Sequence, residues 1–200
     1  MLAESPQTAQ STAKWYTAFA TYETPSLRKA VWQLTNTFAP YLGIWGVMGF
    51  LLLRGYPYWI TLALTVPAAA FLIRIFIFFH DCCHGSFLAS DRANRIVGTL
   101  CGFLTFTPFE DWRRAHAAHH ATAGDLDRRG TGDVWTMTVE EYLAATPLRR
   151  LAYRFLRHPV VMFGFVPAAL SLVCHRFPHR GAGRRERRSV LLTNLAMAGT

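Results

Sequence analysis

Two long apolar runs dominate the first half of the chain, at residues 37–53 and 58–79. Between them stands only the short turn Arg54-Gly55-Tyr56-Pro57. Crossing the hydrocarbon core of a bilayer takes roughly 17–25 apolar residues in a helix. The pattern therefore predicts two membrane-spanning helices that form a hairpin.

The later apolar runs are shorter. Residues 96–109 cannot cross a bilayer, and we expect them to dip into the membrane or lie on it. Residues 159–175 contain Pro167 and precede an arginine cluster, which favours a re-entrant or membrane-associated segment. A last run begins at Val190, as the start of a further transmembrane helix. A natural chain rarely ends inside such a run, so the sequence is expected to be an incomplete fragment.

Residues 138–157 combine a helix-start signal with an amphipathic pattern. Thr138-x-x-Glu141 has the spacing of a capping box. Apolar residues then follow i, i+3, i+4, i+7, i+8 spacing at Leu148, Leu151, Ala152, Phe155 and Leu156, with arginines off that stripe. This pattern predicts a basic amphipathic helix in the headgroup plane of the membrane.

The sequence thus predicts an all-α integral membrane protein: a hairpin of two transmembrane helices, followed by cytoplasmic and interfacial amphipathic helices. The expected segments are a cytoplasmic arm (1–36), the hairpin (37–79), a histidine-bearing cytoplasmic region (80–158), the membrane-associated segment (159–175), a basic cytoplasmic loop (176–189) and the incomplete helix (190–200).

Composition and charge agree with a membrane location. Hydrophobic residues make up 52% of the chain and charged residues 16%, and the net charge of +9 comes mainly from arginine. Basic residues lie before and after the hairpin, against Arg54 alone in the turn, so the positive-inside rule places both hairpin ends in the cytoplasm. These residues flank apolar segments and form no basic groove with interleaved aromatics, which argues against nucleic-acid binding.

The first candidate site is His80-Asp81-Cys82-Cys83-His84, at the inner end of the second apolar run. Histidines four apart on a helix share one face, roughly 6 Å apart, so both imidazoles can reach one metal site. A lone histidine at a membrane interface is usually only a polar cap, and this pair alone would be weak evidence.

The second candidate site is His116-Ala117-Ala118-His119-His120. On a helix His116 aligns with both later histidines, which diverge from each other by about 100°. Five imidazoles in two tight clusters beside a membrane are hard to explain structurally. By contrast, His158, His175 and His179 stand singly among arginines and read as surface or interface residues.

The number of imidazoles favours iron over zinc. A zinc site uses three or four protein ligands, and five or more fit a polynuclear iron site, which also supplies the redox chemistry that zinc lacks. Carboxylates that accept the second ring N–H of a ligand histidine are common. The candidates for that role are Asp81, Asp125, Asp127 and Asp133. Alternatively, these residues are solvated loop acids or helix caps.

The two clusters resemble the first two histidine boxes, H-D-x-x-H and H-x-x-H-H, of the membrane fatty acid desaturase superfamily. Gly85-Ser86-Phe87 after the first box and residues 121–138 after the second are similar to the bacterial acyl-lipid, omega-6-like branch. The likeness corresponds to the N-terminal two-thirds of such a protein. A third H-x-x-H-H box is missing from these residues, so the chain by itself is expected to hold an incomplete site.

The resemblance implies a di-iron centre on the cytoplasmic side of a four-span helical fold, in a bacterial inner membrane. The catalytic metal ligands that it implies are His80, His84, His116, His119 and His120. The implied reaction introduces a cis double bond into a lipid acyl chain, using O2 and two electrons from a carrier such as ferredoxin or a cytochrome.

Three alternatives stay open. A carotenoid ketolase or hydroxylase of the same superfamily shares the boxes. An intramembrane zinc protease would use His80 and His84, but that class places Glu beside the first histidine, where this chain has Asp81, and it leaves the second cluster unexplained. The third alternative is an inactive, truncated membrane remnant.

Overall fold

The structure is a computed structural model and describes residues 24–130 and 134–199. Every regular element within these residues is helical, which confirms the predicted all-α class. The chain forms two compact units, Met1–Cys101 and Gly102–Thr200. In chain order the elements are α2 (Leu27–Leu53), α3 (Tyr58–His84), α4 (Asp91–Leu104), α5 (Phe109–Thr122), α6 (Val139–Ala144), α7 (Pro147–Leu156), the π-helix η1 (Val161–Phe165), α8 (Val166–Leu172), the 3-10 helix η2 (Cys174–Arg176) and α9 (Arg184–Ala198).

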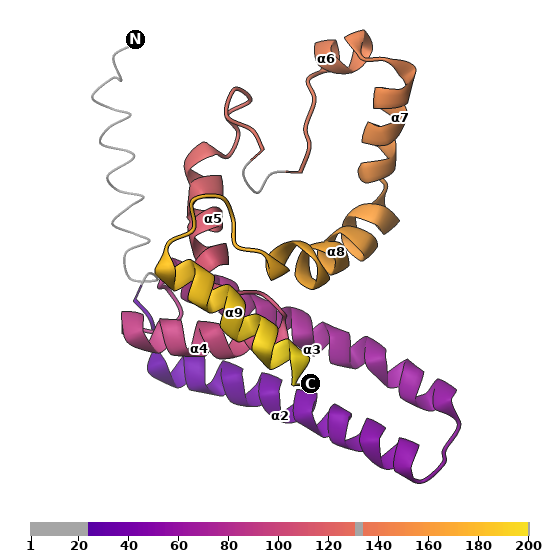
Figure 1. Cartoon of the computed structure of the whole chain (residues 1–200). Helices are drawn as coiled ribbons and strands as arrows, with labels where there is room; N and C mark the ends of the chain where they lie inside the picture. Colours follow the sequence, from indigo (N-terminus) through magenta and orange to yellow (C-terminus); the bar gives the residue numbers. More distant parts are fainter. Residues whose placement is uncertain (1–23, 131–133, 200) are drawn as a thin grey trace, which may run out of the picture. The chain divides into compact units, whose positions relative to one another are not determined.

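In the first unit, α2 and α3 lie side by side as a helical hairpin (Figure 1). Each has 27 residues, which corresponds to about 40 Å of helix and exceeds the roughly 30 Å of a bilayer core. Both helices are long and apolar enough to cross a membrane, as predicted. They also extend beyond the apolar runs, since α2 begins at Leu27 and α3 continues to His84.

The turn between these helices is a Schellman motif. Gly55, with φ of 70°, takes the left-handed conformation that favours glycine. Its N–H donates to the Leu52 carbonyl, and the Tyr56 N–H donates to the Leu51 carbonyl at 3.0 Å. These bonds satisfy carbonyls at the end of α2, so that the chain reverses within four residues.

The hairpin exposes many large apolar residues, and the residues that it buries include small or hydroxyl-bearing ones beside Tyr41 and Met48. Leu42, Val66 and Ile73 expose 61%, 72% and 64% of their surface. Thr37, Thr61 and Ala68 are buried. Small and hydroxyl-bearing residues at buried positions allow close helix packing in lipid, whereas large apolar residues face the acyl chains. This distribution is typical of a membrane hairpin.

In the second unit, the predicted capping box begins α6. The Thr138 hydroxyl accepts from the Glu141 N–H, and the Glu141 carboxylate accepts from the Thr138 N–H. Arg129 adds two charge-assisted bonds to the same carboxylate, at 2.7 and 2.8 Å. The Arg129 guanidinium, followed by the Thr138 N–H, lowers the pKa of Glu141 from 4.5 to about 2.

Helix α7 has the predicted amphipathic pattern, and its apolar stripe points outward. Leu148, Leu151 and Phe155 are 76%, 64% and 62% exposed. The opposite face packs against the unit, where the Tyr153 ring contacts Trp135 and Tyr142. Together with residues 161–176, from which it is bent by 59°, α7 has the length and composition of a broken span or a re-entrant loop. Its place in the headgroup plane stays a prediction.

Helix α9 begins at Arg184, inside the stretch that was expected to be a basic loop. Arginine is a good helix former, and Glu186 in the first turn has the charge that a helix N-terminus favours. The apolar run from Val190 therefore continues a helix that has already started.

Candidate metal centre

The first histidine box lies in the last two turns of α3. The His80 and His84 rings have centroids 4.6 Å apart, as expected for positions four residues apart on one helix face. His80 Nδ1 lies 3.3 Å from the Asp81 carboxylate, which leaves Nε2 as the ring nitrogen that faces away from Asp81. His80 is half-buried and His84 is exposed.

A glycine ends α3 directly after this box. Gly85 has φ of 71°, and the Ser86 N–H donates to the Asp81 carbonyl at 3.1 Å. This is a second Schellman motif, and it makes His84 the last helical residue. The exposed imidazole of His84 therefore stands at a fixed helix end.

The loop after the box is held by one buried amide. Asn94 is only 2% exposed. Its Oδ1 accepts from the Leu88 N–H at 2.9 Å, and its Nδ2 donates to the carbonyls of Leu88, at 2.6 Å, and Gly85, at 3.3 Å. A single side chain thus satisfies three backbone groups of the loop. No local sequence pattern marks Asn94, so its role was not predicted.

The second histidine box lies in the second half of α5. The Nε2 atoms of His116 and His120 are 3.0 Å apart. The His119 ring lies 6.0 Å from that of His116 and 5.6 Å from that of His120, between centroids. The structure therefore brings the ring nitrogens of His116 and His120 together, as the four-residue spacing predicted, whereas the His119 ring lies to the side of this pair.

An aromatic ring orients the first histidine of this box. Trp112 stacks on His116 with centroids 4.2 Å apart and planes inclined by 21°. Since the two residues are one helical turn apart, the stack fixes the plane of the imidazole without using its ring nitrogens. The spacing of the histidines gives no indication of this stack.

Both boxes occupy the C-terminal turns of their helices. His84 is in the last turn of α3, and His119 and His120 are in the last turn of α5. The helix macrodipole places about half a negative charge at this end, which favours a cation. The backbone thus adds to the attraction of each imidazole group for a metal ion.

The donor set fits a transition metal. A metal–imidazole bond is about 2.0–2.1 Å long, so two nitrogens 3.0 Å apart can bind the same ion. Neutral nitrogen donors suit iron, zinc, copper and nickel and not magnesium or calcium. The two boxes belong to different compact units, and their sharing of one pair of ions stays a prediction.

The acidic candidates have different surroundings. Asp81 lies beside the His80 ring. Asp125 instead accepts from the Arg128 guanidinium at 2.6 Å and from the Asp127 N–H at 3.0 Å. The Arg128 bond, more than the backbone bond, lowers the pKa of Asp125. Asp125 thus closes a local turn, and Asp133 lies outside the described residues.

One buried hydrogen-bonded pair was not predicted. Asp111, in the first turn of α5, is 7% exposed and lies 2.5 Å from His179 Nδ1. The sequence gives no local sign of this contact because the two residues are far apart in the chain. His179 is therefore half-buried in a specific contact, whereas His158 is exposed.

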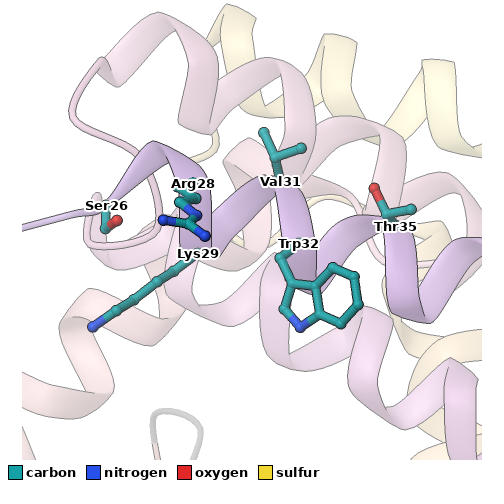
Figure 2. A pocket seen from close by; sticks show the side chains of 6 residues that line it. All are labelled: Ser26, Arg28, Lys29, Val31, Trp32 and Thr35. Carbon is teal, nitrogen blue, oxygen red and sulfur yellow. The ribbon is translucent and has the colours of Figure 1, made fainter.

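An open hollow of about 770 Å³ lies at the start of α2 (Figure 2). Its lining has no imidazole, thiol or carboxylate, so it lacks metal ligands. Basic residues beside an exposed tryptophan are typical of the headgroup layer of a membrane. The lining residues are Ser26, Arg28, Lys29, Val31, Trp32 and Thr35.

Comparisons with known proteins agree with the histidine pattern. The family model for "Fatty acid desaturase" matches residues 57–200. A fatty acid desaturase of Bacillus subtilis is 48% identical over 178 residues, which cover 89% of this chain and 50% of that protein. An sn-1 acyl-lipid omega-3 desaturase (ferredoxin) of Synechocystis is 36% identical over 34% of this chain and 18% of its own length. A probable fatty acid desaturase of Sorghum bicolor is 34% identical over 44% of this chain and 22% of its own length.

The chain spans about half the length of the Bacillus subtilis relative. No solved structure matches it. The family match covers most of the chain and includes both histidine boxes and the second helix of the membrane hairpin. The chain belongs to the fatty acid desaturase family.

Proposed function

We propose that the protein is a membrane desaturase that introduces a cis double bond into a lipid acyl chain, with two iron ions held in part by the five box histidines. The observation that carries the proposal is the family match over residues 57–200. The geometry of each box supports it, because His80 and His84 share a helix face and His116 and His120 bring their nitrogens within 3.0 Å.

In this reaction two adjacent methylene groups each lose one hydrogen, and O2 takes up these hydrogens with two electrons and two further protons to give two waters. When bound, the iron ions supply the oxygen activation that an unactivated C–H bond requires. The proposed ligands of this chain are His80, His84, His116, His119 and His120.

Other residues of the chain orient these ligands. The Asp81 carboxylate, 3.3 Å from His80 Nδ1, can accept the proton on that nitrogen, and this directs Nε2 to the metal. Trp112 holds the plane of His116 through stacking. Gly85 and Asn94 fix the helix end at which His84 stands.

The proposed electron donor is a carrier such as ferredoxin or a cytochrome. The name of the Synechocystis relative includes ferredoxin. Arginines of α7 and α9 give the second unit a strongly basic character, and such charge increases the association rate with an acidic carrier.

Fatty acid analysis of cells that express the full-length gene product tests this function. In a bacterium with saturated membrane lipids, we expect new cis-monounsaturated acyl chains in gas chromatography with mass spectrometry. The empty vector provides the control. Unchanged acyl chains together with oxygenated carotenoids, in a host that makes carotenes, would support the ketolase or hydroxylase alternative instead.

We also propose that the protein lies in a bacterial inner membrane with both ends of the hairpin in the cytoplasm. The basic residues Arg28 and Lys29 at the start of α2, and Arg92 and Arg95 after α3, support this orientation through the positive-inside rule. The turn at Gly55 would then face the periplasm.

Cysteine labelling tests the orientation. A cysteine in place of Tyr56, which is exposed in the turn, is expected to react with a membrane-impermeant maleimide in spheroplasts. A cysteine in place of Ala89, exposed after the first box, is expected to react only after lysis. Mass spectrometry of the labelled peptides separates both positions from the native cysteines. Labelling of position 89 in intact spheroplasts would refute the orientation.

A further inference from the structure

The first half of α5 is fixed by buried groups. Among its residues, Phe109 and Asp111 are buried, with 1% and 7% exposure, while the histidines toward its C-terminal end are half-buried or exposed. The N-terminal end of α5 is therefore packed into the unit, and its C-terminal end carries the imidazoles.

The central contact of the fixed end is the pair of Asp111 and His179. The Asp111 carboxylate lies 2.5 Å from the His179 ring Nδ1 and also 3.4 Å from the His179 backbone N–H. Two donors from one residue thus meet the same carboxylate oxygen. A buried carboxylate needs such donors, because leaving it without them carries a large desolvation cost.

The turn that contains His179 makes a further contact with α5. The Ala182 N–H donates to the His179 carbonyl, and Gly181 adopts φ of 79°. This turn aims the Gly181 carbonyl at Arg114, whose guanidinium donates to it at 3.1 Å. Asp111 and Arg114 are three residues apart, so the turn contacts two neighbouring positions on one face of α5.

Helix α9 supplies two more contacts. The Ser189 hydroxyl accepts from the Glu110 N–H at 3.1 Å, which satisfies one of the open donors at the start of α5. Glu186 lies 3.5 Å from Arg114. The packing of α5 on α9 is the main helix–helix contact recorded in the second unit (Figure 1).

We propose that Asp111 and His179 form a latch that sets the rotation and position of α5 and thereby aims His116, His119 and His120. Both are positioning residues, which act through the helix and not on the substrate. This inference rests on the proposed function, since it takes the three histidines as metal ligands.

A small rotation of α5 would be enough to displace the proposed metal ligands. Side-chain tips lie about 5–6 Å from a helix axis, so a rotation of about 20° moves an imidazole by about 2 Å. Metal–ligand distances tolerate only about 0.2 Å. With its buried contacts intact, α5 keeps the histidines within about 0.2 Å of the positions that a metal ion requires. Without the contact between Asp111 and His179, we expect the helix to shift by more than this distance.

Metal binding and hydrogen exchange of the full-length gene product in lipid nanodiscs test the latch. Asp111→Asn and His179→Gln keep side chains of similar size, but the first removes the carboxylate and the second removes the imidazole of the pair. We expect each to weaken the binding of Co²⁺, used alone as the probe, by about tenfold and to alter its visible absorption spectrum. We also expect faster amide exchange in residues 112–121, with α2 and α3 unchanged. The double variant should be no worse than either single variant, because the two residues act as one pair.

Asp125→Asn is the matched control, since this carboxylate follows the same box but closes only a local turn. It should leave the Co²⁺ affinity, its spectrum and the exchange of α5 unchanged. Wild-type Co²⁺ affinity, spectrum and α5 exchange in Asp111→Asn would overturn the latch. A wild-type protein that binds no Co²⁺, or binds it equally well without His119, would instead contradict the proposed ligands, and α5 exchange would still decide the latch.

Discussion

Alanine in place of His84 or His120 is expected to abolish iron binding and product formation in the full-length gene product. Both imidazoles are exposed, so their removal takes away little packing and should leave the fold intact. Loss of a residue that merely supports a metal ligand lowers affinity by about 10–100-fold, and loss of a ligand should cost at least about 100-fold. Iron per chain, measured by mass spectrometry after purification, and fatty acid analysis of the same cells check both effects.

His158→Ala is the matched control for this experiment. His158 is also exposed, but it stands outside both boxes, after α7. We expect full iron content and wild-type product in this variant. Full iron content and turnover in His84→Ala or His120→Ala would remove that residue from the ligand set.

The elements that the sequence predicted well are those whose signal is local and periodic. Apolar length indicated α2 and α3, and the spacing of Thr138 and Glu141 indicated the cap of α6. The helical face shared by His116 and His120 follows from four-residue spacing. In each case one turn of helix or one apolar run contains all the information.

Helix ends were harder to predict. The apolar run that ends at Phe79 stops before α3 does, because Gly85 and not the loss of hydrophobicity terminates the helix. Likewise α9 starts among arginines, since arginine has good helix propensity and a basic run is compatible with a helix or a loop. Hydropathy reports where lipid contact ends, whereas hydrogen bonding decides where a helix ends.

The contacts that position the histidines could not be predicted. Asp111 and His179 meet only after the intervening residues have folded, and no periodicity relates them. Their bond is between side chains of different elements, and sequence patterns describe single elements. The metal-binding chemistry of the candidate site was therefore predictable from two short motifs. The contacts between elements that hold these motifs in place were not predictable.

The two boxes nevertheless share one local design. Each places its exposed histidine at the C-terminal turn of a helix, where the macrodipole favours a cation. Each also has a supporting contact outside the motif: Asn94 behind the first box and the pair of Asp111 and His179 behind the second. The proposed ligands His84 and His120 are thus exposed, whereas Asn94 and Asp111 are buried.

Replacing Asn94 by alanine is expected to unfold the loop after the first box and to free the end of α3. The substitution leaves the Leu88 N–H and the carbonyls of Leu88 and Gly85 without their partner. At about 1–3 kcal/mol for each buried group left unsatisfied, and with water reaching part of the opened loop, the expected loss is about 2–4 kcal/mol. This corresponds to amide exchange at Leu88 that is about 30-fold faster or more, measurable by hydrogen exchange with mass spectrometry.

Two further variants separate this effect from a general weakening of the loop. Ser90→Ala removes only a long, exposed bond to the Ala93 N–H, at 3.4 Å, and should change exchange at Leu88 little. Asn94→Asp keeps an acceptor for the Leu88 N–H but turns a buried carboxylate oxygen toward the carbonyls of Leu88 and Gly85, so its effect should be at least as large as that of alanine. Because His84 directly precedes the loop, Asn94→Ala should also weaken Co²⁺ binding, and wild-type exchange at Leu88 in this variant would show that the loop does not depend on Asn94.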